Sequence, residues 1–243
     1  MDSVVPSPGS PRPPILARLH DAPTAHGLTI PFITLCHRQR RDPIWGAIDP
    51  THLHLVFSFA LCQVCGKSFG DRVVVLLRPQ DWALGVAPEP GLHPECCSYA
   101  VRGCPVLAGR ITHYRSRAAA ARITRCDDPA CECRIWLPPE TGSQEDLRAG
   151  KPIDDWYAVW LDRDDYQIIH HHRGDENTPS LTGVRMRGVP LLAIRKIRDA
   201  TPDPGQDEST DRSMPTVLDL LATQIALDRL TTSETGVQGE DLA

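Results

Sequence analysis

The sequence predicts an α+β protein, and three observations favour this class. Short runs rich in Val, Leu, Ile and Tyr, which are typical of strands, recur between Pro- and Gly-rich loops in the first 199 residues. Two segments, 50–61 and 214–230, instead carry the apolar spacing of an amphipathic helix. Most of the nine cysteines stand in groups with short spacings. In a cytoplasmic protein such groups favour metal binding, nucleophiles or core positions over disulfides.

Composition and charge exclude some classes of protein. A hydrophobic content of 41% in 243 residues suffices for a core, whereas 5% aromatic residues and 23 prolines indicate extended or unfolded parts. No apolar run approaches the ~20 residues needed to cross a bilayer, and the N-terminus lacks the pattern of a secretion signal. We therefore expect a cytoplasmic protein with no membrane partner. The net charge of -5 belongs to residues 200–243, which carry two arginines against nine acids.

The first elements follow from local signals. Residues 1–14 are rich in Pro and Ser and predict a disordered lead. Residues 28–35, "LTIPFITL", predict a strand that Pro31 would place at a sheet edge. For 50–61 the run "LVFSF" favours a strand, but Asp49 followed by Pro50 resembles a helix cap and its first residue. The helical spacing of the apolar residues that follow leads us to predict a helix there.

Further elements are expected beyond these. Residues 71–79 predict a strand that ends at Pro79, and the stretch from His93 to Gly103 predicts a helix. The segments 156–161 and 166–172, separated by the turn "DRDD", predict a β-hairpin. Residues 183–198 are compatible with a strand or a short helix. Residues 214–230 predict an amphipathic helix with Ser213 as its cap.

The first cysteine group has the spacing of a metal site. Cys62-x2-Cys65 is followed, after 27 residues, by His93-x2-Cys96. A Cys-x2-Cys turn followed by Gly66 is typical of a zinc knuckle, and positions i and i+3 of a helix face the same way. Together they offer three sulfurs and one nitrogen, a set typical of structural zinc. The order knuckle, strand or hairpin, helix-borne ligands predicts a treble-clef-like zinc module.

Other interpretations of this group stay open. A redox pair would need the Cys-x2-Cys turn to open a helix within a βαβ pattern, and no such pattern surrounds it. Core cysteines without a ligand role are the other alternative. Within the zinc interpretation, Cys97 and Cys104 share a helix face with His93 and compete with Cys96. We prefer Cys96, because ligands on a treble-clef helix are usually separated by two residues.

These motifs resemble a known family. The segments 61–70, "LCQVCGKSFG", and 88–109, "PEPGLHPECCSYAVRGCPVLAG", are similar to uncharacterised zinc-knuckle proteins of actinobacteria and their phages. The likeness covers about 45–110, with a weaker echo in 150–161. It implies Cys62, Cys65, His93 and Cys96 as ligands and Cys104 as the thiol before Pro105. The loop 77–87 and Cys97 depart from the family pattern, and no known activity comes with the resemblance.

A second cysteine group, Cys126-x4-Cys131-x-Cys133, could hold a second metal ion. Its spacing matches no common zinc pattern, so unligated thiols and a redox-active pair remain alternatives. A fourth ligand must come from elsewhere. We take His113 as the candidate, with Cys104 and Cys36 as further options.

These groups and elements define the expected organisation. A treble-clef-like zinc module is followed by a β-rich half and a C-terminal amphipathic helix. The expected parts are a disordered lead (1–14), the zinc-binding module with its flanking strand and helix (15–135), a β-rich segment that packs on it (136–199), an acidic linker (200–213), the amphipathic helix (214–231) and a loose tail (232–243).

An acid-free, arginine-rich stretch joins the two cysteine groups. From Cys96 to Cys126 there is no Asp or Glu, but there are six arginines. Uncompensated arginine beside a zinc module favours contact with a phosphate backbone, although a solvated basic helix is an equal alternative. The candidate nucleic-acid-binding residues are Arg110, Arg115, Arg117, Arg122 and Arg125.

The sequence therefore predicts a binding protein rather than an enzyme. The motifs of zinc deaminases, metalloproteases, P-loop enzymes and serine hydrolases are absent. We expect structural zinc and a nucleic-acid-binding or regulatory interaction module. One alternative is a metal-dependent hydrolase of nuclease type, with His113 and Asp127 as the only nearby candidates. Another is an adaptor that binds a protein partner or a second copy through 214–230.

Overall fold

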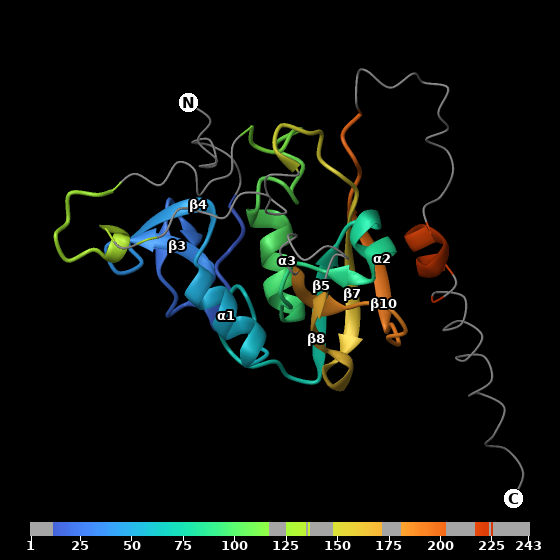
Figure 1. Ribbon diagram of the computed structural model, residues 1–243. Coiled ribbons are helices and arrows are strands. Elements are labelled where there is room, and N and C mark those ends of the chain that lie inside the picture. Colours follow the sequence, from blue (N-terminus) through green and yellow to red (C-terminus); the bar gives the residue numbers. More distant parts are fainter. Residues whose placement is uncertain are drawn as a thin grey trace, which may run out of the picture.

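A computed structural model describes residues 12–116, 125–134, 136, 148–171, 181–202, 217–223 and 225 (Figure 1). This part of the chain is a mixed α+β structure, rich in short strands, with few helices. None of its helices is long and apolar enough to span a membrane.

The main sheet lies at the centre of the molecule (Figure 1). Its antiparallel strands run in the order β10-β7-β5. Their bounds are β5 (Arg72–Leu77), β7 (Trp156–Asp162) and β10 (Ala193–Arg198). The sequence "RVVVLL" of β5 is buried from its second residue onward, because β-branched and aliphatic side chains pack well on both faces of a covered strand.

A smaller sheet has the order β6-β9-β8 and is also antiparallel. Its strands are β6 (Val86–Ala87), β8 (Ile168–His171) and β9 (Leu181–Arg185). Val86, Ala87 and Val184 are buried. Ala87 and Val184 join the same hydrophobic core as β5 and β7.

Three helices begin with proline, whose fixed φ suits the first helical position. They are α1 (Pro50–Ser58), α2 (Pro79–Leu84) and α3 (Pro94–Gly103). The predicted cap of α1 is confirmed, because the Asp49 carboxylate accepts hydrogen bonds from the amides of Thr51 and His52. α3 lies against β5, with Cys96, Cys97 and Tyr99 buried.

A separate lobe is built on short N-terminal strands. They form two hairpins, namely β1 (Thr24–Ala25) with β2 (Leu28–Thr29) and β3 (Thr34–His37) with β4 (Asp42–Ile48). Leu35 and Ala47 form a small apolar cluster on the second hairpin, joined by Ile44 and Trp136. In Figure 1 the segment that begins at Cys126 lies beside β3 and β4, away from the main sheet. Three short 3-10 turns complete the described elements, at Ala17–Leu19, Glu132–Arg134 and Arg163–Asp165.

The predicted hairpin of 156–161 with 166–172 is wrong. Both segments contain a strand, but β7 pairs with β5 and β10, whereas β8 pairs with β9. A 3-10 turn at Arg163–Asp165 separates them. The turn residues carry a local signal, but the partner of a strand is set by non-local packing. The same limit applies to 183–198, which contains β10 and the end of β9, and to 28–35, where Pro31 separates β2 from β3.

The C-terminal helix is described at residues 217–223 and 225, which are helical. Leu218 is 1% exposed and belongs to the main core. The Tyr157 hydroxyl donates a hydrogen bond of 3.0 Å to Asp219 Oδ1. The remainder of 214–231, most of the lead 1–14 and of the linker 200–213, and all of the tail 232–243 lie outside the described residues.

Candidate metal centres

The first centre brings together the four residues that the spacing predicts. Cys62 and Cys65 lie on the turn between α1 and β5, His93 directly precedes α3, and Cys96 is in its first turn. One ligand atom from each of the four lies within 4.8 Å of the others. Cys62 and Cys96 are fully buried, and His93 is 3% exposed. These four residues are called the first centre below, and they could hold a metal ion.

The turn that carries Cys62 and Cys65 closes on itself. The Gly66 amide donates to the Cys62 carbonyl at 2.8 Å, and the Cys62 amide donates to the Lys67 carbonyl at 2.9 Å. Gly66 has φ of +68°, a conformation that glycine adopts without a steric penalty. A Cβ at this position would also lie 2.7 Å from the ring of Phe32. Glycine therefore serves both the turn and its packing.

The ring of His93 is oriented by its backbone neighbour. His93 Nε2 lies 2.9 Å from the Ser68 carbonyl, and because a carbonyl only accepts, Nε2 is the donor. Nδ1 lies 3.4 Å from Cys65 Sγ, and it is the nitrogen that could bind a metal ion once it has lost its proton. The edge of Phe69 packs against the same ring, with centroids 5.5 Å apart. Such a hydrogen bond on the far nitrogen is a usual support for a metal-binding histidine.

The four side chains perturb one another's protonation. Hydrogen bonds with Cys62 and Cys65 raise the pKa of His93 to about 10. Hydrogen bonds with Cys62 and Cys96 lower the pKa of Cys65, and those with Cys62 and Cys65 raise the pKa of Cys96. Their close packing therefore favours a thiolate at Cys65 and a protonated thiol at Cys96. A divalent cation in their midst would stabilise all of them as thiolates.

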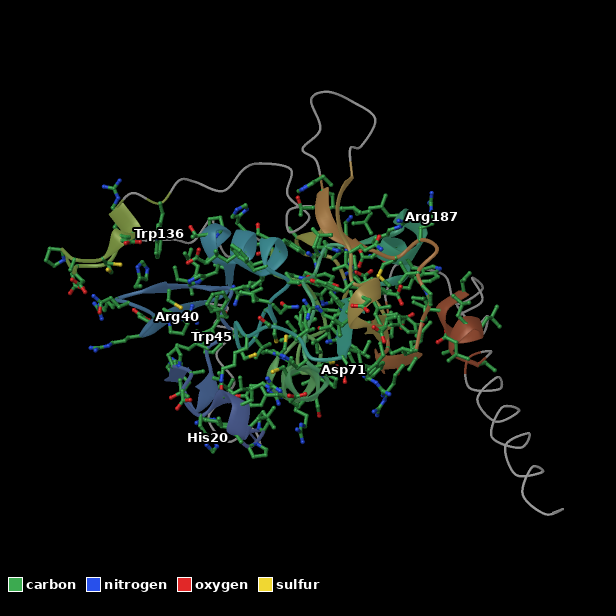
Figure 2. All side chains as sticks on the ribbon, turned by 90° about the horizontal axis from the view of Figure 1, so that it is seen from below. His20, Arg40, Trp45, Asp71, Trp136 and Arg187 are labelled. Atoms are coloured by element: carbon green, nitrogen blue, oxygen red, sulfur yellow. The ribbon has the colours of Figure 1, made fainter. Side chains whose placement is uncertain are left out.

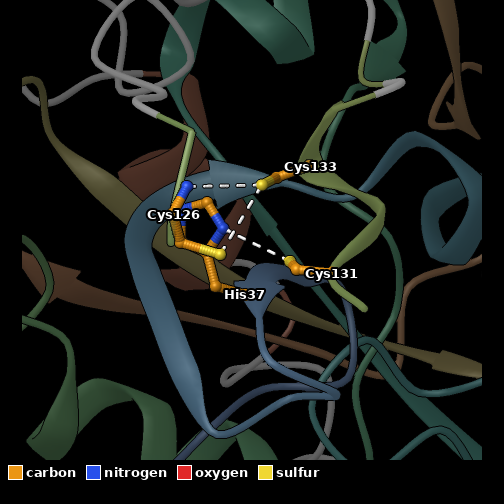
Figure 3. A group of neighbouring side chains, drawn as sticks. All are labelled: His37, Cys126, Cys131 and Cys133. Atoms are coloured by element: carbon orange, nitrogen blue, oxygen red, sulfur yellow. Dashed lines mark hydrogen bonds between the residues drawn. The ribbon is translucent and has the colours of Figure 1, made fainter. Parts of the chain in front are cut away.

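The second centre is formed by His37, Cys126, Cys131 and Cys133, whose ligand atoms also lie within 4.8 Å of one another (Figure 3). His37 is the last residue of β3, and Cys133 lies in the 3-10 turn at Glu132–Arg134. The Cys126 and Cys133 sulfurs are 3.6 Å apart, and His37 Nδ1 is 3.6 Å from Cys131 Sγ. This group could also hold a metal ion.

Backbone amides point at the sulfurs of the second centre. The Arg38 amide lies 3.5 Å from Cys131 Sγ. The Cys126 amide lies 3.4 Å from Cys133 Sγ (Figure 3). The hydrogen bond from Arg38 is the main reason that the pKa of Cys131 falls to about 6. The ring of Trp136 stacks on His37, with centroids 4.8 Å apart and planes at 28°. The site therefore has supporting contacts of its own.

The fourth member of the second centre is His37, rather than His113, Cys104 or Cys36. His113 Nδ1 lies 3.0 Å from the Thr112 hydroxyl, and its backbone bridges to Pro152. Cys36 precedes His37 in β3, so the two side chains point to opposite faces of the hairpin. Cys36 Sγ instead donates to the Thr34 carbonyl. His37 is 94 residues from Cys131. No spacing rule joins residues so far apart, so sequence analysis did not find it.

The alternative ligands of α3 are also placed. Cys97 is 3% exposed and packs in the main core, and burial raises its pKa to about 12. Burial likewise raises the pKa of Cys104. Neither thiol belongs to either group of metal-binding side chains within the described residues.

The predicted nucleic-acid-binding arginines are described in part. The guanidinium of Arg110 lies at the end of α3. It donates hydrogen bonds to the Gly103 carbonyl at 3.4 Å and to the Arg102 carbonyl. The guanidinium of Arg115 lies beside Gly46 of β4, 3.1 Å from the position of a Cβ there. Arg125 is exposed next to Cys126. Arg117 and Arg122 lie outside the described residues.

The residues considered for a nuclease centre, His113 and Asp127, belong to neither cluster that could hold a metal ion in the described residues. Asp127 forms an ion pair with Arg38, and His113 is not part of either metal-binding group. In the part of the chain that the structure describes, both groups consist only of Cys and His. Each set offers four ligand atoms, the number that a four-coordinate metal site takes.

No family model, curated protein or solved structure matches this chain. The resemblance to zinc-knuckle proteins of actinobacteria and phages is therefore not confirmed as a family relationship. The four residues that it implies as ligands do lie together and could hold a metal ion.

Proposed function

We propose that this chain is a zinc protein in which two structural ions hold a nucleic-acid-binding surface. Each centre offers three sulfurs and one nitrogen, the soft ligand set that zinc prefers, and leaves no position open for a substrate. The knuckle is followed by β5, α2, β6 and then α3, which carries Cys96. A strand and then a ligand-bearing helix after the knuckle support a treble-clef-like module around the first ion.

The acid-free stretch between the centres carries the nucleic-acid part of the proposal. Arg102 and Arg110 are exposed and adjacent at the end of α3, and Arg125 is exposed beside the second centre. No ion pair of these three arginines occurs within the described residues. Their charge is therefore available to phosphate. Since the two zinc centres anchor both ends of the stretch, its arginines would follow a backbone rather than read bases.

The test is binding of fluorescently labelled DNA and RNA at increasing salt. Neutralising several phosphates releases counterions, so the logarithm of the binding constant should fall linearly with the logarithm of salt concentration. The double change Arg102→Ala with Arg125→Ala should reduce that slope by about two, because each phosphate contact contributes roughly 0.9.

A matched control is available in Arg187→Ala. Arg187 is also exposed, but it lies on the far side of the molecule from Trp136 and the second centre (Figure 2). Its replacement should leave binding and slope unchanged. Absence of binding at low salt, with two zinc ions bound, would refute the nucleic-acid proposal while leaving the zinc proposal intact.

The C-terminal helix supports a second candidate function, that of an interaction module. Leu218 is buried on the main body, but Val217 and Leu220 of the same helix are 62% and 56% exposed. A cavity of about 410 Å³ lies beside them, lined in part by Trp82 and Met186. A second copy of the chain could bury these apolar side chains. Deleting 214–243 should then reduce the mass of the particle in solution from that of two copies to that of one, and leave the zinc content of each chain unchanged.

A further inference from the structure

The turn of the first centre rests on the segment that leads into β3. The Phe32 amide donates to the Val64 carbonyl at 2.9 Å, and the Ile33 amide donates to the Gln63 carbonyl at 3.2 Å. The ring of Phe32 faces Gly66 so closely that a Cβ there would collide with it. The position of Phe32 therefore depends on the closed turn around Cys62 and Cys65.

Arg40 links this segment to the tip of the β3–β4 hairpin. Its guanidinium donates to the Phe32 carbonyl at 2.8 Å and to the Pro31 carbonyl at 3.1 Å. It also lies over the ring of Phe32, 5.6 Å from the centroid. His52 of α1 contacts both Arg40 and Phe32. Its Nδ1 lies 3.2 Å from the Arg40 guanidinium, and its ring centroid lies 4.3 Å from that of Phe32. Arg40 is thus fixed by several independent contacts.

The hairpin tip that Arg40 holds has a left-handed backbone, and it directs the amide of Arg38 at the second centre. Arg38, Gln39 and Arg40 have φ of 50°, 53° and 69°, a left-handed conformation that side chains other than glycine disfavour. Three such residues in succession persist only where surrounding contacts impose them. In this conformation the Arg38 amide points at Cys131 Sγ, next to His37.

We propose that Phe32 and Arg40 connect the two metal centres, so that the first centre, once filled, positions the second one and raises its affinity for zinc. This inference rests on the proposed zinc function. Successive contacts join the two centres. The closed turn at Gly66 packs on Phe32, Phe32 contacts Arg40, and the left-handed tip that Arg40 holds contacts Cys131. Coupling between two binding sites is reciprocal. The first ion therefore strengthens binding of the second, and the second strengthens binding of the first by the same factor.

The experiment compares zinc retention in the full-length protein and in Arg40→Ala under chelators of graded affinity. Each zinc ion released is assigned by comparison with Cys131→Ser, which lacks a ligand of the second centre. Loss of an outer contact of a metal site typically weakens binding about 10- to 100-fold. In Arg40→Ala we expect the zinc affinity of the second centre to fall by this factor. The direct effect on the zinc affinity of the first centre should be much smaller.

Two further variants separate positioning from general damage. Arg41→Ala removes an exposed arginine from the same hairpin tip and should leave both affinities unchanged. Arg40→Lys keeps the charge but cannot donate to both carbonyls in a fixed fork, so it should recover only part of the affinity. If the lower zinc affinity came from the lost charge alone, lysine would restore it fully. Full recovery in Arg40→Lys would therefore contradict the proposal.

Filling order provides the second measurement. In zinc titrations of the metal-free protein, the first centre should fill before the second. Wild-type protein that binds no zinc would refute the zinc function itself. Two bound ions whose affinities are unchanged in Arg40→Ala would refute only the linkage.

Discussion

The two metal centres have the same donor set but different surroundings. The first is enclosed by the main core, where Val64, Phe69 and Leu92 are almost completely buried. The second lies on a hairpin whose own apolar cluster has, among the described residues, Leu35 and Ala47 as its buried members. A ligand set of one kind can therefore stabilise a whole fold or only one lobe, according to the amount of apolar surface that packs around it.

The largest difference is expected when one ligand is removed from each centre. Cys62→Ser should abolish the cooperative unfolding transition, because a structural zinc site provides on the order of 10 kcal/mol and a whole domain is stable by only about 5–15 kcal/mol. Cys131→Ser should lose one zinc ion and disorder the β3–β4 lobe while the main sheet still unfolds cooperatively. Thermal unfolding followed by circular dichroism, with zinc content measured in parallel, tests this. If Cys131→Ser also lost the cooperative unfolding transition, the second centre would be shown to support the main core as well.

A smaller difference is expected in thiol reactivity. Once a chelator has emptied the second centre and left the first filled, Cys131 should react with iodoacetamide at pH 7, since its pKa of about 6 makes it mostly thiolate. Its rate should fall as pH drops through 6, where the thiolate is protonated. Cys97, whose burial raises its pKa to about 12, should stay unmodified at pH 7. Mass spectrometry of the peptides measures both rates, and equal labelling would contradict the assignment.

The two centres also differ in how far the sequence predicts them. The ligands of the first stand in local pairs, and the cap formed by Asp49 and Pro50 likewise places α1 from neighbouring residues alone. Local spacing is visible in a sequence because turn and helix geometry fix it. The second centre takes three thiols from one segment and His37 from a distant hairpin. That contact depends on tertiary packing, to which spacing rules do not extend.

The same division explains the error in the sheet. The strand character of 156–161 follows from its apolar, β-prone residues, and its position is correct. The choice of β5 and β10 as partners depends on which apolar faces the fold covers, which a neighbouring turn sequence does not specify. Arg40 is a further example. Its sequence context is an ordinary basic turn, and its contacts with Pro31 and Phe32 follow only from the folded hairpin.

The smallest difference concerns two glycines, Gly66 in the turn of the first centre and Gly46 in β4. Gly66 and Gly46 have φ of +68° and +85°, so alanine at either position incurs a left-handed backbone cost of about 1–2 kcal/mol. At Gly66 the new methyl group would also meet the Phe32 ring at 2.7 Å, whereas at Gly46 it would lie 3.1 Å from the guanidinium of Arg115. The ring is held by His52 and Arg40 and cannot move away freely, so Gly66→Ala should cost roughly 1–3 kcal/mol more than Gly46→Ala. Denaturant unfolding of the zinc-loaded variants measures this difference. Equal losses would mean that the Phe32 ring yields, and that the first centre is less tightly packed than its buried surroundings indicate.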